Sequence, residues 1–167
     1  LSDDEIEMLT VVRKHFKKVV LLLNVGNIID MTDINRIAPD AVLYVWQGGM
    51  TGGKGTADVL TGKISPSGKL PDTIAHKASD YPSDANFGRE KNRDIYAEDI
   101  YVGYRYFETF AKDKVLYPFG FGLSYTEFEI KTEKAEITEG AVKLSVSVKN
   151  IGSYKGKEVI EVYCEAP

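Results

Sequence analysis

Cysteine and histidine are scarce in this sequence, long apolar runs are missing, and positive charge is not in excess. One cysteine and two histidines among 167 residues exclude an internal disulfide and lack the spacing of a zinc ligand set. The formal net charge of -4 comes from scattered acidic and basic residues, which give no basic stripe for nucleic acid and no polybasic patch for a membrane. We therefore expect no metal ion, no cofactor, no nucleic-acid partner and no membrane partner.

The sequence shows no targeting segment. No run reaches the length of a membrane span, and the first residues lack the charged, apolar and cleavage segments of a signal peptide. The single cysteine, Cys164, fits a reducing compartment, so a cytoplasmic location is favoured. The sequence starts at Leu1, directly before a capped helix and without an initiator methionine, which predicts that it is an excerpt from a longer polypeptide.

The first third of the chain carries the pattern of a β–α–β unit. Ser2 and Glu5 form a capping-box pair before apolar residues at helical spacing, which predicts an opening amphipathic helix. Apolar runs over 19–23 and 42–46, separated by a helical turn within 28–37, predict two strands joined by a crossover. Because such crossovers are right-handed, we expect the two strands to be parallel.

The loops after these two strands are the first place to look for a ligand site. Open α/β sheets bind ligands beyond the carboxyl ends of their strands, so Asn24 is expected near Gln47 at that edge. The second strand, which ends at Trp46, reads as apolar on both faces, and this predicts helical layers on both sides of the sheet. The candidate site is therefore the segment 46–53, with Trp46, Gln47 and Met50 as its ligand-proximal residues.

The glycine-rich stretch after the second strand has two explanations. The spacing of Gly48, Gly53 and Lys54 nearly matches a phosphate-binding loop. However, Gly55 stands where a serine or threonine would hold magnesium, and Thr56 comes one place too late. A loop whose glycines let the backbone approach a ligand or a neighbouring domain explains the composition without a nucleotide.

The residue pattern identifies no catalytic group. Cys164 lies in an alternating strand, and neither histidine is placed to activate it. Glu98 and Asp99 are adjacent on a segment that reads as extended, so they point to opposite faces and cannot form the carboxylate pair of a glycosidase. We expect them instead to accept hydrogen bonds or to pair with Arg93 or Arg105.

The second half of the chain changes character twice. Residues 76–93 read as a long polar loop, and a stretch dense in tyrosine and phenylalanine follows, which favours core and interface packing. From Phe128 onward apolar and polar residues alternate, over 142–148 and again over 159–163, which predicts antiparallel strands with one buried face. Two or three strands leave an apolar face and free edges, so we expect pairing with missing strands or with another copy of the chain.

Several of these segments together resemble the C-terminal part of glycoside hydrolase family 3, the β-glucosidase and β-xylosidase family. The family's strand and Asn-small-Gly loop resemble VVLLLNVGNIID at 19–30, and its glycine loop, helix and Pro-Ser-Gly-Lys-Leu turn resemble VWQGGMTGGKGTADVLTGKISPSGKLPDTIA at 45–75. Its two signature stretches resemble YAEDIYVGYRYFE at 96–108 and YPFGFGLSYTEFEI at 117–130. The tail, 141–167, is similar to the opening strands of the family's fibronectin type III-like domain. The second half looks most like bacterial members of the family.

The resemblance implies an α/β fold in two domains. Residues 1–124 would form a partial α/β sandwich with a mainly parallel sheet, and residues 125–167 the first antiparallel strands of a truncated fibronectin type III-like β-sandwich. The activity implied is that of a retaining β-glycosidase, with β-glucosidase favoured, which hydrolyses terminal β-linked sugars of oligo- or aryl-β-glycosides.

The resemblance assigns no catalytic residue to this sequence. The family's Asp nucleophile belongs to a TIM-barrel domain of the same polypeptide, and its acid/base Glu matches no position here, so the chain alone is expected to be inactive. Trp46, Gln47 and Met50 are expected to be substrate-proximal, in the wall of the sugar site. A homo-oligomer through exposed β edges is a further expectation. The alternative function is a non-catalytic binding or scaffolding module.

Overall fold

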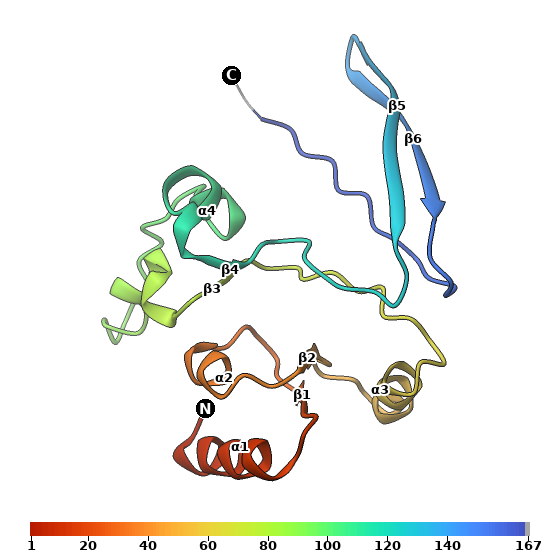
Figure 1. The fold of residues 1–167 in the computed structure, drawn as a ribbon. Helices are drawn as coiled ribbons and strands as arrows, with labels where there is room; N and C mark the ends of the chain where they lie inside the picture. The colour runs from red at the N-terminus through yellow and green to blue at the C-terminus, as the bar shows by residue number, and fades with distance from the viewer. Residues whose placement is uncertain (166–167) are drawn as a thin grey trace. The chain divides into compact units, whose positions relative to one another are not determined.

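The computed structural model describes residues 1–165 of the chain (Figure 1). The chain divides into two compact units: residues 1–53 together with 70–121, and residues 54–69 together with those from 122 onward. Helices and strands both contribute, as expected for an α/β fold. Among the described residues, no helix is long and apolar enough to cross a membrane.

The first unit opens with two helices and two strands in alternation. Their bounds are α1 Asp3–His15, β1 Val20–Leu23, α2 Thr32–Ile37 and β2 Ala41–Tyr44. Ser2 caps α1, because its hydroxyl accepts the backbone N–H of Glu5 while the Glu5 carboxylate accepts the backbone N–H of Ser2. The strands β1 and β2 are parallel. The predicted capping box and parallel pair are both confirmed.

Asp40 fastens the end of α1 to the start of the sheet. Its carboxylate accepts the backbone N–H of Val19 at 2.8 Å and pairs with Arg13 at 2.9 Å and with Lys18 at 3.5 Å. The hydrogen bond from Val19, followed by the two cations, holds the pKa of the Asp40 carboxyl below its usual value. The short link between α1 and β1 is therefore held in place by charge as well as by apolar contact.

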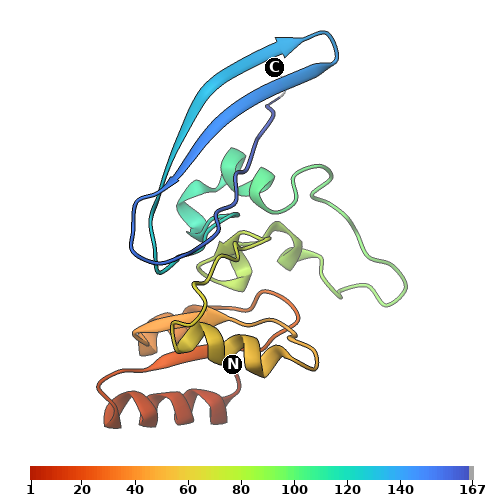
Figure 2. The ribbon, with the colours of Figure 1, turned by 90° about the vertical axis from the view of Figure 1, so that its right-hand side faces the viewer.

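The core of the first unit is small and lies on one face of the β1–β2 pair. Leu23, Met31, Ile34 and Ile74 form a buried cluster with exposed fractions of 4% or less. Helix α1 lies on one side of the pair and the β3–β4 ribbon on the other (Figures 1 and 2). Most of β2 is only half-buried, so the predicted burial of this strand on both faces is wrong for the described residues, where its sheet has two strands. The helical layers expected on both faces stay a prediction.

The remainder of the first unit is built around one buried aromatic ring. Its elements are β3 Ile74–Ala75, the 3₁₀ turns Ala78–Asp80, Pro82–Ala85 and Lys112–Lys114, α4 Tyr104–Phe110 and β4 Val115–Tyr117. The antiparallel pair β3–β4 is short and irregular. Phe107 is 1% exposed, and its ring meets that of Tyr81 edge-on at 5.3 Å. The predicted packing role of the aromatic stretch is confirmed for this ring.

The second unit holds a helix and a long β-hairpin. Helix α3, Gly52–Leu60, starts in the last residues of the first unit, and the hairpin consists of β5 Phe128–Thr138 and β6 Ala141–Asn150. Gly62 ends α3 with φ 73°, a left-handed conformation in which glycine commonly ends a helix, and its N–H donates to the Val59 carbonyl at 2.9 Å. The strands β5 and β6 run side by side as a curved ribbon (Figure 2).

A bulge keeps the large apolar residues of the hairpin on one face. The register shifts between Thr132 and Lys134, so Glu133 is an extra residue in β5. Without this bulge Lys134 would stand on the apolar side, because side chains alternate with a period of two. The residues that share the apolar face are Ile130, Thr132, Ala135, Ile137, Val142, Leu144, Val146 and Val148.

This apolar face is exposed within the described part of the chain. Ile137 is 86% exposed and Val142 57%, so the expectation of an open apolar face is confirmed and that of one buried face is wrong here. The alternating segment 159–163 forms no strand, although its pattern predicts one. A strand needs a hydrogen-bonded neighbour, and none of the described segments pairs with it. The division into domains 1–124 and 125–167 stays a prediction.

Candidate functional site

The loops that follow β1 and β2 meet at the carboxyl edge of the parallel pair. The Val45 N–H donates to the Leu23 carbonyl at 3.0 Å, so pairing continues one residue past β2. Beyond it, the Gln47 side chain lies against Gly26 in the loop after β1. The predicted meeting of the two loops is confirmed, with Gly26 as the residue that contacts Gln47. Sequence reasoning named Asn24 as the neighbour and missed Gly26, although Gly26 belongs to the same Asn-Val-Gly loop.

Trp46 is the residue at which the chain turns away from the sheet. Its φ is 51°, in the left-handed region that bulky side chains rarely adopt. The strand ends at Tyr44, so the prediction that Trp46 ends the strand is wrong: a left-handed residue cannot continue a β ladder. The Trp46 and Tyr44 rings lie 5.0 Å apart at 40°. Burial raises the pKa of the Tyr44 hydroxyl, which is oriented toward the Met31 sulfur at 3.8 Å.

Gln47 offers free hydrogen-bonding capacity at this edge. Gln47 is exposed. Its side-chain amide is close to Gly26 but makes no hydrogen bond within residues 1–165. A primary amide carries two donor hydrogens and one acceptor oxygen. Such a group can bind a hydroxyl in either direction, which suits ligands rich in hydroxyls.

Met50 and the glycines around it form an open tip. Met50 is fully exposed, and Gly49 has φ 58°, a conformation that glycine adopts without strain. A Cβ on Gly48 would stand 2.8 Å from the Gly52 Cα, so this position has no room for a side chain. Trp46, Gln47 and Met50 thus lie on one short loop, as predicted, but they do not converge on a closed cavity.

The second half of the glycine-rich stretch is helical, which corrects the prediction of a continuous loop through Gly55. Gly52 already belongs to α3. Lys54 pairs with Asp58 at 2.6 Å, one turn along the same helix, and this hydrogen bond raises the pKa of Lys54. The lysine that fits the spacing of a phosphate-binding loop is therefore occupied by its own helix.

The carboxylates Glu98 and Asp99 make neither of the ion pairs predicted for them. Arg93 pairs with Glu90, and Arg105 donates to the backbone carbonyl of Ile100 at 3.1 Å. Asp99 has φ 51° within a turn, so the segment is not extended as predicted. Each arginine is instead bonded to an acceptor three to five residues earlier in the sequence.

Two hollows lie outside the carboxyl edge, one in each unit. The hollow in the first unit has a volume of about 140 Å³ and is lined by Ile28, Asp72, Thr73, Tyr81, Pro82, Ser83, Glu98, Val102 and Gly103. The hollow in the second unit has a volume of about 380 Å³ and is lined by Leu60, Thr61, Gly62, Tyr125 and Tyr154. In the first hollow the Tyr81 hydroxyl is already bonded to the backbone of Thr73 and Ala75. Neither hollow contains any of the predicted site residues Trp46, Gln47 or Met50.

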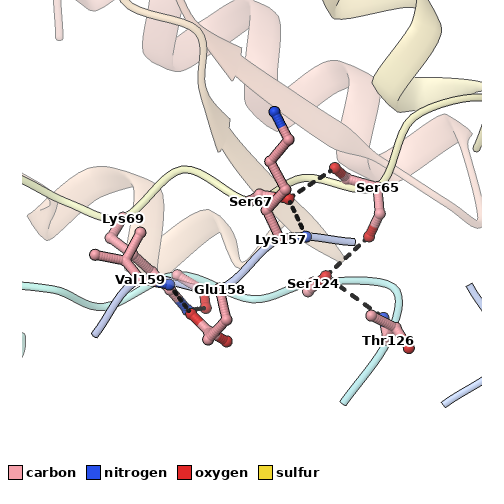
Figure 3. Close-up of polar contacts among 9 residues, drawn as sticks. Ser65, Ser67, Lys69, Ser124, Thr126, Lys157, Glu158 and Val159 are labelled. Atoms are coloured by element: carbon pink, nitrogen blue, oxygen red, sulfur yellow. Dashed lines mark hydrogen bonds and ion pairs between the residues drawn. The ribbon is translucent and has the colours of Figure 1, made fainter. Parts of the chain in front are cut away.

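Hydroxyl groups of the Pro-Ser-Gly-Lys turn join the separate segments of the second unit (Figure 3). The Ser65 hydroxyl lies 2.8 Å from that of Ser124. It also accepts the backbone N–H of Tyr125 at 3.0 Å. The Ser67 hydroxyl accepts the backbone N–H of Lys157 at 3.2 Å. These bonds satisfy backbone donors that belong to no strand, so the turn organises two irregular segments.

Lys69 adds a charged contact to the same turn. Its ammonium donates to the Gly122 carbonyl at 2.8 Å. It also pairs with Glu158 at 2.9 Å (Figure 3). The Lys69 and Glu158 side chains are only 18% and 14% exposed. The hydrogen bond from Lys69 lowers the pKa of the Glu158 carboxyl. The arrangement is that of a structural anchor, because every polar group in it is paired with another.

The carboxyl edge carries hydrogen-bonding and apolar side chains, but none that can move protons. The side chains that it offers are an indole, an amide and a thioether, and none of them serves as a general acid or base near neutral pH. No three His, Cys, Asp or Glu side chains within residues 1–165 gather in a way that would hold a metal ion.

Residues 1–125 match the family model described as the glycosyl hydrolase family 3 C-terminal domain. The chain therefore belongs to glycosyl hydrolase family 3. Its α/β fold is confirmed by solved structures of the same family. The chain is similar to a β-glucosidase from Paenibacillus barengoltzii, with a TM-score of 0.84 and 52% identity over 92% of this chain and 17% of that one. It is also similar to β-glucosidase 3B from Thermotoga neapolitana, with a TM-score of 0.82 and 41% identity over 91% of this chain and 22% of that one.

Relatives named β-glucosidase match the chain at the level of sequence as well. A β-glucosidase from Ruminococcus albus is 63% identical over all of this chain, which covers 17% of that protein. β-Glucosidase A from Butyrivibrio fibrisolvens is 43% identical, again over all of this chain and 22% of its own length. The chain thus spans about a fifth of the length of the relatives that it matches.

Proposed function

We propose that this chain is part of a retaining β-glucosidase that removes terminal β-linked sugars from oligo- or aryl-β-glycosides. Membership of glycosyl hydrolase family 3 supports this proposal, as do relatives named β-glucosidase that match the whole chain. A structure of the T. neapolitana relative holds glucose. The rest of the polypeptide, including a TIM-barrel domain, would supply the chemistry that the described residues lack.

Within that enzyme the loop 46–50 contributes to the wall of the sugar site. The observation that carries this role is the free amide of Gln47 at the carboxyl edge of β1 and β2, seated on Gly26. In a sheet of this kind ligands bind at that edge, and sugar hydroxyls can both accept from and donate to an amide. Trp46 and Met50 add apolar surface beside it.

The carboxylates that retaining hydrolysis needs come from elsewhere in the polypeptide. A double displacement requires a nucleophile and an acid/base about 5 Å apart, and the loop 46–50 contains no carboxylate. We expect the purified 167-residue chain to release no p-nitrophenol from its β-glucoside, whereas the natural polypeptide that carries the chain does. Hydrolysis by the chain alone would contradict this, and inactivity of both proteins would favour a binding or scaffolding module.

Replacement of Gln47 tests its place in the wall. We expect Gln47→Ala in the natural polypeptide to lower kcat/KM by about tenfold, because a hydrogen bond to the substrate in the transition state contributes about 1–3 kcal/mol. The melting temperature should change little, since the Gln47 amide bonds to nothing else within residues 1–165. If the melting temperature fell while kcat/KM stayed at the wild-type value, Gln47 would be an ordinary packing residue.

A further inference from the structure

The contact between Gly26 and Gln47 involves the whole amide group of Gln47. A Cβ built on Gly26 would lie 3.0 Å from Nε2, 3.3 Å from Cδ and 3.7 Å from Oε1 of Gln47. The three distances differ by less than the amide's own bond lengths, so the amide presents its face, and not its edge, to Gly26. Real Cβ atoms approach a neighbour this closely in fewer than about one case in ten, so the contact depends on the missing side chain.

The backbone of Gly26 does not itself require glycine. Its φ lies outside the left-handed region that Gly49 occupies at 58°. At Gly48 glycine is explained by backbone packing, since a Cβ there would collide with the Cα of Gly52. At Gly26 the nearest atoms all belong to the Gln47 side chain. What glycine provides at position 26 is therefore space for that amide.

We propose that Gly26 is a positioning residue, which seats the Gln47 amide so that its free donors and acceptor face a sugar hydroxyl. This inference rests on the proposed function. The left-handed Trp46 directs residue 47 across toward the loop after β1, and the bare backbone of Gly26 lets the amide lie there. A methyl group at position 26 would push the amide by a few tenths of an ångström or into another rotamer.

Such a displacement acts on the hydrogen bond to the ligand, because hydrogen bonds weaken steeply when their angle falls. It leaves the protein's own hydrogen bonds unchanged, since the Gln47 amide makes none within residues 1–165. The effect of an alanine at position 26 should therefore depend on Gln47 being present. This dependence separates positioning from a general loss of stability.

A double-mutant cycle in the natural polypeptide tests the proposal. We expect Gln47→Ala to lower kcat/KM for an aryl β-glucoside about tenfold, and Gly26→Ala to lower it about threefold to tenfold, since small misplacements of a binding group reduce turnover strongly. On the Gln47→Ala background, Gly26→Ala should cause no further loss. Gly68→Ala is the matched control, because a Cβ on Gly68 meets no atom within 4 Å, and its kinetics should equal those of the wild type.

The outcomes distinguish two failures. If Gln47→Ala reduces kcat/KM but Gly26→Ala does not, or if the two losses multiply in the double variant, the positioning role of Gly26 is wrong, while the place of Gln47 in the wall of the sugar site is supported. If Gln47→Ala leaves kcat/KM unchanged, Gln47 is not part of that wall, and the positioning role of Gly26 is wrong as well. A crystal structure of the Gly26→Ala variant gives a readout besides activity: the Gln47 amide should be displaced, and an amide in its original place would overturn the proposal.

Discussion

Trp46 lies where the chain leaves β2, and its left-handed backbone has an energetic cost. A bulky residue with φ near 51° is strained by about 1–3 kcal/mol, and such strain persists only where the surroundings hold it. Here the Tyr44 ring lies against the indole at 5.0 Å. The strained residue stands directly before Gln47, so the local geometry serves the placement of that amide. No feature of a single sequence marks a tryptophan as left-handed, which is why this turn was not predicted.

Gly122 lies against the backbone of Gly68 in the second unit. A Cβ at this position would collide with the carbonyl oxygen of Gly68 and would stand 3.0 Å from Cδ of Lys69. We predict that Gly122→Ala lowers the free energy of unfolding by about 1–3 kcal/mol, because backbone atoms must move to admit the methyl group. Urea unfolding followed by circular dichroism measures this.

Gly55→Ala is the control for this prediction. Gly55 lies within α3, and an added Cβ there meets nothing within 4 Å. Since alanine is a better helix former than glycine, the free energy of unfolding of the Gly55→Ala variant should be unchanged or raised by up to about 1 kcal/mol. Equal unfolding midpoints for the two variants would show that the approach at Gly122 relaxes without cost.

At the scale of helices and strands, the sequence predicted the elements that depend on interactions between residues close together in the chain. The capping box at Ser2 and the alternation over 142–148 identified α1 and β6, because each pattern acts within a few residues. Helix α4 was not predicted: it begins after Gly103, which has φ 59°, and no side chain caps it. Its formation depends on the burial of Phe107, which is a tertiary contact.

The candidate site was predicted in outline but not in its contacts. Right-handed crossover topology brings the loops after β1 and β2 together, and this much follows from the order of the elements. The identity of the touching residues, Gly26 and Gln47, depends on the conformation of Trp46. The predicted burial of β2 on both faces was wrong for a different reason. An apolar pattern shows which side chains a strand can bury, but it does not show which other elements lie against the strand.

The Lys69–Glu158 pair links the Pro-Ser-Gly-Lys turn to the segment that follows β6, and its contribution depends on pH. Because the pKa of Glu158 is lowered in the folded chain, the pair stabilises above the unfolded pKa of about 4.3, and this stabilisation is lost as pH falls through the folded pKa. We predict that Glu158→Gln lowers the free energy of unfolding by about 1 kcal/mol at pH 7. The difference from the wild type should shrink below about pH 4.5.

Thermal unfolding of both proteins between pH 3 and 7 measures this difference. The matched control is Glu129→Gln, whose partner Lys131 is 63% exposed, and exposed pairs contribute little. A gap between wild type and Glu158→Gln that stayed constant across the pH range would show that the carboxylate charge has no role in the anchor.

At the scale of the whole molecule, the hairpin has one charged face and one apolar face that nothing in the described residues covers. Its charged face carries Glu129, Lys131, Lys134 and Glu136, which keep that side solvated. The apolar face has Ile137 at 86% exposed and Val142 at 57%, and contiguous exposed apolar surface of this kind marks an interaction surface or an aggregation liability. Free strand edges on the hairpin add unpaired backbone groups.

We predict that the 167-residue chain self-associates through this face. Sedimentation velocity should show a concentration-dependent shift to larger species, since association removes the exposed apolar residues from water. Val142→Lys places a charge on the apolar face, opposite Ile137, and should keep the chain monomeric, because burial of an unpaired charge is costly. Ser145→Lys, on the opposite face, should associate as the wild type does. Association that Val142→Lys left unchanged would assign the contact to another surface, and the free edges of β5 and β6 would then be tested with proline substitutions, which remove a ladder donor.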